Sequence, residues 1–207
     1  MIESYLNDDA DLNRKVVPEI IRLINEARVN PQSYINRLQD YLSNWKKMDL
    51  SHDSDDENEE LEVKQTIDHF KKHKIVVPLE QQNSLQTSSK AQLDYILKTG
   101  NVSHYGENYE PMRERIQRDV KQKGNYAECF VSDRLTAETI VLSVMMDIGL
   151  EDKPNRSILL DNNFKSIGVA LTSDFKGTAF CVIHLFGDSK SKITSKFVEN
   201  ELDNCPW

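Results

Sequence analysis

Cysteine and glycine are scarce in this sequence, and both scarcities exclude kinds of site. The three cysteines, Cys129, Cys181 and Cys205, form an odd and widely spaced set, which is not a disulfide framework. Neither a Cys-x-x-Cys pair nor a His-Glu-x-x-His run occurs, so no spacing is typical of a closed zinc site. Seven glycines are too few for a glycine-rich phosphate cradle besides ordinary turns, and no P-loop, dinucleotide fingerprint or Gly-x-Ser-x-Gly motif is present. We therefore expect no cofactor.

Long apolar runs are also missing. No stretch approaches the ~20 apolar residues that a membrane-spanning helix needs. The opening stretch, MIESYLNDDADLNRKVV, is acidic and lacks the apolar segment of a secretory signal. We therefore expect a reduced, intracellular protein of the cytoplasm.

Positive charge is in deficit, with 26 lysines and arginines against 34 acidic residues and a net charge of −8. Nucleic acid and anionic membrane surfaces are bound through a basic face, so we expect neither as the main partner. The acidity itself is typical of a soluble protein.

The 207 residues, 38% of them hydrophobic, are enough for one domain with tails. We expect an N-terminal tail at 1–15, a domain at 16–188 and a C-terminal tail at 189–207. Within the domain, residues 49–60 are acidic and almost free of apolar side chains, which predicts a solvated loop.

Apolar spacing predicts helices first and strands last. Residues 16–30 carry apolar side chains at 17, 20, 21, 24 and 27, which is helical spacing with one solvated face. Similar patterns predict helices at 31–45, 61–74, 83–100, 110–124 and 136–149, with an extended segment at 76–79. The apolar runs at 164–172 and 178–187 predict strands, the second one buried on both faces. This order indicates an α+β or three-layer α-β-α domain.

Five motifs in this order resemble the CAP superfamily, the SCP-like domains of cysteine-rich secretory proteins, antigen 5 and plant pathogenesis-related proteins. They are SHYGENYEPMRERI, YAECF, TAETIVLSVMMDIG, NRSILLDNNFKSIGVAL and FCVIHLFG, and the opening EIIRLINEARVNPQSYI is similar to the first helix of the family. The resemblance covers roughly 16–188. It implies an α-β-α sandwich with a small antiparallel central sheet, and a cleft lined by two histidines and two acidic residues.

The resemblance also places the cleft residues. His104 matches the first histidine, Glu128 the first acidic position and Asp147 the second. Asn155, in PNRSILL, stands where the family has its second histidine. His184 lies in the last strand, where a different polar residue is usual. The resemblance thus implies a degenerate cleft of His104, Glu128, Asp147 and Asn155.

The asparagine changes the expected chemistry. Two imidazoles can share a divalent metal, whereas an asparagine amide supplies no such nitrogen and does not titrate near neutral pH. A zinc site generally needs at least three protein ligands, so we expect no metal here. The Asn155 amide can still donate to Glu128 or Asp147 and satisfy a carboxylate in a partly buried cleft.

Each of these residues could instead have a purely structural role. His104 follows a helix end that it could serve, Glu128 could be a surface acid at a strand end, and Asp147 could be a solvated helix-terminal charge. His69 and His73 are four residues apart and could hold a metal, but a basic solvated face is the better interpretation.

Two of the cysteines are also best interpreted as structural residues. Cys181, in an apolar strand, is predicted to be core. Cys129 has no histidine close in sequence, which disfavours a nucleophile.

Three functions remain for such a chain. The first is a non-catalytic interaction or scaffold subunit, with protein partners, in a larger intracellular assembly; a cytoskeletal or ciliary complex would fit. The second is a sterol- or lipid-binding protein whose apolar residues 140–146 line the pocket. The third is a weak hydrolase with His104 and either Glu128 or Asp147 as base.

Overall fold

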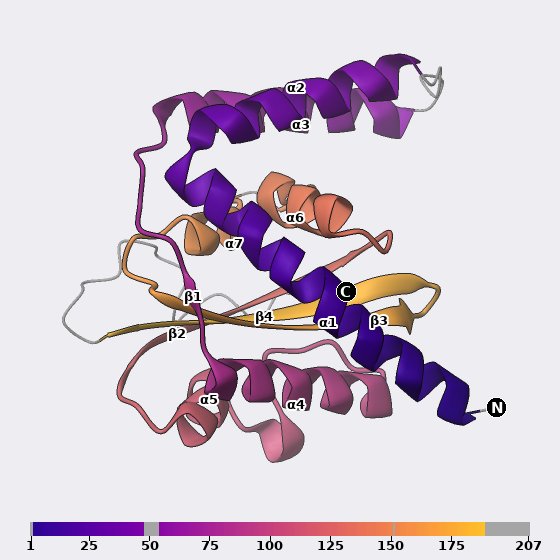
Figure 1. The fold of residues 1–207 in the computed structure, drawn as a ribbon, viewed down its shortest axis with the longest axis vertical. Coiled ribbons are helices and arrows are strands. Elements are labelled where there is room, and N and C mark those ends of the chain that lie inside the picture. Colours follow the sequence, from indigo (N-terminus) through magenta and orange to yellow (C-terminus); the bar gives the residue numbers. More distant parts are fainter. Residues whose placement is uncertain (1, 48–53, 151, 189–207) are drawn as a thin grey trace.

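The computed structural model describes the whole chain except residues 1, 48–53, 151 and 189–207. The predicted C-terminal tail and residues 49–53 of the predicted acidic loop therefore lie outside the described residues. A four-stranded sheet lies between helical layers (Figure 1). Helices α4 (Asn83–Thr99) and α5 (Met112–Val120) cover one face. Helices α1 (Ile2–Val29), α6 (Ala137–Met146) and α7 (Pro154–Leu159) cover the other, and α2 (Pro31–Lys47) and α3 (Ser54–Lys72) lie beyond them. The predicted α-β-α sandwich is present.

The first helix is much longer than the apolar pattern predicts. It begins at Ile2, so the segment 1–15 that we set apart as a tail is helical from its second residue. Asn13 ties it to the sheet, because its amide donates to the Leu171 carbonyl and its side-chain oxygen accepts from the Leu171 amide. Leu12 packs against the core. These contacts join residues that are far apart in sequence, so they leave no local sequence signal.

The acidic loop is also shorter than predicted. Helix α3 already begins at Ser54, so residues 54–60 are helical rather than loop. Acidic side chains suit the first turns of a helix because they face the positive end of its dipole. Lys64 pairs with Glu60 one turn away, which adds a little to the same helix.

The sheet has the order β1-β3-β4-β2. Strands β2 (Gly124–Asp133), β3 (Ser166–Phe175) and β4 (Thr178–Asp188) are antiparallel, as the small central sheet was predicted to be. The two-residue strand β1 (Glu80–Gln81) joins β3 in parallel, which the sequence did not predict. Strand β4 lies between β3 and β2 and is buried along most of its length, as its continuous apolar run indicates.

Alternation along β2 sends its side chains to opposite faces of the sheet. Cys129 and Val131 belong to the large core cluster that holds α1 and α6 residues. Tyr126 and Phe130 pack in the two smaller clusters with residues of α4 and α5. Successive side chains of a strand point to opposite faces, so Glu128 lies on the α4 and α5 face.

Helix α4 approaches the sheet closely at Gly168. A Cβ at Gly168 would lie 2.2 Å from the backbone carbon of Leu85, so only glycine fits. Ser89 fastens the same contact, because its hydroxyl donates to the Gly168 carbonyl at 2.9 Å. The helix ends at Gly100 with a left-handed φ of 70°, as its glycine predicted.

Arg28, at the end of α1, is fully buried and joins three separate segments. Its guanidinium donates to the carbonyls of Val77 at 2.8 Å, Asp161 at 3.2 Å and Phe164 at 3.1 Å, and also to that of Leu159. Burial lowers the pKa of Arg28 to about 10, so the side chain stays charged at neutral pH. The end of α1, the segment before β1 and the connection from α7 to β3 therefore share one buried cation.

The described helices include none that is both long and apolar enough to cross a membrane.

Candidate functional site

Glu128 is the centre of a buried polar cluster on the α4 and α5 face. Its Oε1 lies 2.9 Å from Nδ1 of His104, and its Oε2 lies 2.6 Å from Nε2 of His184 and 2.8 Å from an Nη of Arg115. Glu128 is only 1% exposed, and His184 is fully buried. Both carboxylate oxygens are therefore occupied by protein groups, which buried charges require.

Four different elements bring this cluster together. Strand pairing places Glu128 of β2 directly opposite His184 of β4. Arg115 comes from α5, whose buried side also carries Met112 and Ile116. His104 follows α4 and its ring stacks on that of Phe130, with centroids 4.7 Å apart and planes 12° apart.

The electrostatics favour an ionised Glu128. Burial alone opposes ionisation, but Arg115, His104 and His184 outweigh it, and the pKa of the Glu128 carboxyl lies far below its ordinary value. An ionised carboxylate only accepts hydrogen bonds, so His104 Nδ1 and His184 Nε2 both carry protons. Burial also lowers the pKa of His184, so its imidazole is neutral at pH 7.

Asp147 and Asn155 form a second pair. Asp147 ends α6 with a left-handed φ of 54° and is 4% exposed. The Asn155 amide donates to Asp147 Oδ1 at 2.6 Å, and the backbone amide of Arg156 donates to Oδ2 at 3.1 Å. Burial raises the pKa of Asp147, and these two donors offset part of that rise. The asparagine thus satisfies one of the two carboxylates that we expected it to reach, and Asp147 is not a solvated charge.

The four predicted cleft residues form two pairs on either side of β2. His104 and Glu128 lie on the α4 and α5 face, whereas α6 and its Asp147 lie over the face that holds Cys129. A cavity of about 140 Å³ borders the second pair at this outer strand and reaches Phe130, on whose ring His104 stacks. The structure therefore places the two pairs on opposite faces of β2.

Metal binding is not supported by this arrangement. Among the described residues, no group of three or more histidines, cysteines and acids is placed to hold a metal ion. In the first cluster the histidine nitrogens that face Glu128 are hydrogen-bond donors, so only the opposite nitrogen of each ring could be a ligand. Asn155 supplies no imidazole to the second pair.

The geometry resembles the carboxylate and histidine of a catalytic triad. A carboxylate that binds one nitrogen of a histidine can orient the ring as a base, and Glu128 does this for His104. Cys129 follows Glu128 in sequence but points to the other face of the sheet. Burial raises the pKa of its thiol well above the ordinary value, which disfavours the thiolate.

Sequence reasoning missed the roles of Arg115 and His184. Arg115 occupies the apolar side of α5 beside Met112 and Ile116, and an arginine at such a position is a signal for a buried ion pair. His184 interrupts the apolar run of β4, and a polar residue there needs a partner on a neighbouring strand. Neither signal names Glu128 as that partner without the strand register.

The other candidates have structural surroundings. Cys181 is fully buried in the core, as predicted, and burial raises the pKa of its thiol. The ring of His69, on α3, stacks with that of His73, the residue after the helix, and their centroids lie 6.0 Å apart. Burial lowers the pKa of His69 to about 4 and also lowers that of His73, so the face that they form is not cationic at neutral pH.

Comparison with known proteins gives the family. The sequence profile of the cysteine-rich secretory protein family, named CAP, matches residues 21–185, which is most of the chain. The chain belongs to the CAP family. A comparison with curated protein sequences found no match.

Two solved structures are similar to this CAP chain. One is an outer surface protein from Borrelia burgdorferi, with 12% identity, a TM-score of 0.47, and coverage of 55% of this chain and 80% of that one. The other is an extracellular protein containing an SCP domain from Bacillus anthracis str. Ames, with 12% identity, a TM-score of 0.46, and coverage of 64% of this chain and 41% of that one.

Proposed function

We propose that this CAP protein is a non-catalytic interaction subunit of a larger assembly. The observation that supports it is that both cleft carboxylates are bound internally. Glu128 is held by Arg115 and two histidines, and Asp147 by Asn155 and a backbone amide. A carboxylate with both oxygens occupied is not ready to bind a metal or to take a proton from a substrate. The cleft residues then stabilise the domain, and function lies on its surface.

One apolar surface suits a protein partner. Val29 at the end of α1 is 39% exposed, and Ile75 and Val77 are 70% and 43% exposed. These residues lie near one another, because the amide of Val76 donates to the carbonyl of Arg28. Grouped exposed apolar side chains are typical of protein–protein contacts.

The test is the size of the native particle. Full-length protein from its own cells should elute with a stoichiometric partner, well above the 23.9 kDa of the chain. The double variant I75D/V77D should shift the protein toward the monomer position. L97D, which changes an exposed leucine on α4, should leave the elution unchanged. Elution of the unaltered protein as a free monomer would contradict the proposal.

The setting of the assembly is part of this proposal. The cytoskeletal or ciliary assembly and the intracellular location named from the sequence stay predictions. Fractionation of the same cells tests both, because a subunit of a stable polymer should sediment with it.

The hydrolase alternative stays a prediction with a direct test. If His104 acted as a base, His104→Ala would abolish any hydrolytic activity while the far-ultraviolet circular dichroism stayed unchanged. We expect no activity in either protein.

The sterol or acyl alternative also stays a prediction. Of the segment 140–146 that was expected to line a lipid pocket, Ile140, Val144, Met145 and Met146 are core residues. Lipid extraction of the purified protein followed by mass spectrometry tests the idea, and a protein free of lipid would remove it.

A further inference from the structure

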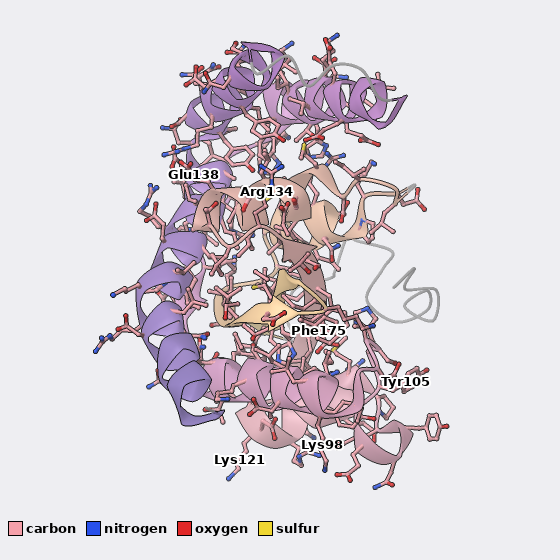
Figure 2. All side chains as sticks on the ribbon, turned by 90° about the vertical axis from the view of Figure 1, so that its right-hand side faces the viewer. Lys98, Tyr105, Lys121, Arg134, Glu138 and Phe175 are labelled. Atoms are coloured by element: carbon pink, nitrogen blue, oxygen red, sulfur yellow. The ribbon has the colours of Figure 1, made fainter. Side chains whose placement is uncertain are left out.

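A second and larger cavity lies between helices α2 and α6. Its volume is about 370 Å³, within the range of roughly 300–1,000 Å³ that is usual for small-molecule sites. Figure 2 shows Glu138 and Arg134 on the segment that begins α6, between the α2 and α3 helices and the sheet. The cavity is separate from both polar pairs described above, because it shares no lining residue with either.

The floor of this cavity is apolar. Leu23 of α1, Leu38 of α2 and the α6 residues Val141 and Leu142 line it, together with the rings of Tyr34 and Tyr41. Leu38 and Val141 are core residues, whereas Leu142 is only partly buried. Such a floor accepts an aliphatic or aromatic body of a ligand and gains from its burial.

One carboxylate among the charged groups of the lining has no ion-pair partner there. Three lining residues carry charge, and two of them, Arg37 and Glu138, pair with each other at 3.0 Å. Arg37 also pairs with Glu26 at 3.1 Å, so the arginine is shared between two acids. The third charged residue, Asp40, forms no ion pair or hydrogen bond within the described part of the chain. The charge balance of the lining is therefore negative, and Asp40 is its unpaired group.

The N-terminus of α6 does not make the cavity favourable for anions. A helix N-terminus attracts anions, and in the lining Thr136 is the N-cap of α6 while Glu138 and Thr139 lie in its first turn. The Thr136 side chain already accepts from the Thr139 amide at 3.0 Å, and the Glu138 carboxylate lies in the same turn. The helix end thus has its own cap and its own anion.

We propose that this cavity binds a small amphiphilic amine, with its apolar body on Leu38 and Leu142 and its ammonium group beside Asp40. The lining also holds the aromatic residues Tyr34 and Tyr41, and aromatic rings attract cations rather than anions to their faces. A fatty acid of equal length would instead bring a second carboxylate next to Asp40. The proposal is independent of the scaffold function, since it uses none of the residues on which that function rests.

The test compares three probes that differ only in their polar group. Octylammonium, octanol and octanoate are titrated, below their micellar concentrations, into the isotopically labelled full-length protein. Octylammonium should bind most tightly and octanoate least, with amide shifts concentrated on α2 and α6. In Asp40→Asn the affinity for octylammonium should fall about threefold to fivefold, because an exposed ion pair is worth little, while that for octanol stays unchanged.

A second pair of variants tests the place of binding. Leu142→Trp puts an indole into the cavity and should abolish binding of all three probes. Leu97→Trp, at a position 40% exposed on α4, is the matched control and should bind as the unaltered protein does. Octanoate binding as tightly as octylammonium would overturn the proposal, and so would octylammonium binding that survives Leu142→Trp. The comparison of the probes needs no variant, so a poorly folded Leu142→Trp leaves the charge preference testable.

Discussion

At the scale of single residues, Glu128 shows what burial demands of a charged side chain. It is bonded to one full cation and two imidazoles, and its ionised form prevails over the cost of burial. Removing one partner of such a group leaves a buried charge without compensation, which costs much more than an exposed ion pair contributes. Arg115 is the only one of the three partners that carries a permanent charge.

Replacing Arg115 by methionine should therefore destabilise the domain strongly. We expect a loss of about 3 kcal/mol in the free energy of unfolding, measured by urea denaturation at pH 7. Arg113→Met, an exposed position two residues away on α5, should change it by less than about 0.5 kcal/mol. Equal effects of the two variants would show that the contact between Arg115 and Glu128 contributes nothing of note.

Glu128 should also make the domain sensitive to acid. Its pKa is lower in the folded chain than its ordinary value of 4.5, so its stabilising effect is fully present above pH 4.5. That effect is lost as the pH falls below 4.5 toward the folded pKa, because the unfolded chain takes up the proton first. Asp147 acts with the opposite sign, since its pKa is raised in the folded chain.

The contribution of Glu128 is isolated by comparison with Glu128→Gln. Chemical denaturation at a series of pH values from about 6 down to 3 should show a steeper loss of stability in the unaltered protein than in the variant. Glu114→Gln, on the exposed side of α5, should keep the steep profile. Parallel profiles for the unaltered protein and Glu128→Gln would contradict the assignment.

At the scale of helices and strands, the apolar pattern of the sequence predicted the elements that depend on local sequence alone. The apolar spacing of 16–30 gave a helix, and the continuous apolar run of 178–187 gave the buried strand β4. The long start of α1 was missed because Asn13 is held by Leu171, a contact across 158 residues. Strand β2 was not predicted, because Glu128 and Ser132 break its apolar pattern and its pairing with β4 is what defines it.

The sequence named His104, Glu128, Asp147 and Asn155 as site residues, but it predicted neither the roles of Arg115 and His184 nor the arrangement of the site. The motif positions of Asp147 and Asn155 implied neighbours, and the two do bond. Motifs in order along a chain do not show on which face of a strand each one lies. That depends on the pleat of β2, which turns Glu128 away from Asp147.

The packing of α4 on β3 should depend on the missing side chain at Gly168. Gly168→Ala places a methyl group 2.2 Å from the Leu85 backbone, so the helix has to move away from the sheet. We expect a loss of about 3 kcal/mol in the free energy of unfolding, as for strong overpacking. Gly100→Ala meets no atom within 4 Å and should cost only about 1 kcal/mol for its left-handed backbone. Similar losses in thermal denaturation would mean that α4 adapts to the added methyl.

At the scale of the whole molecule, the sheet separates the Glu128 cluster from the two other sites. The Glu128 cluster lies on the face covered by α4 and α5, whereas the pair of Asp147 and Asn155 and the larger cavity lie on the side of α6. Figure 1 shows these helices on opposite faces of the sheet. Each of the three sites has its own balance of charge and burial.

Arg28 gives the molecule a cooperative unit that its secondary structure does not reveal. One guanidinium at the end of α1 holds the carbonyls of Val77, Asp161 and Phe164. The end of α1, the segment before β1 and the connection from α7 to β3 should therefore open to solvent in a single event. Native-state hydrogen exchange should give the amides around them one common opening free energy. In Arg28→Met the amides of these segments should show separate and lower opening free energies. Regions that are distant in sequence would then open to solvent independently of one another.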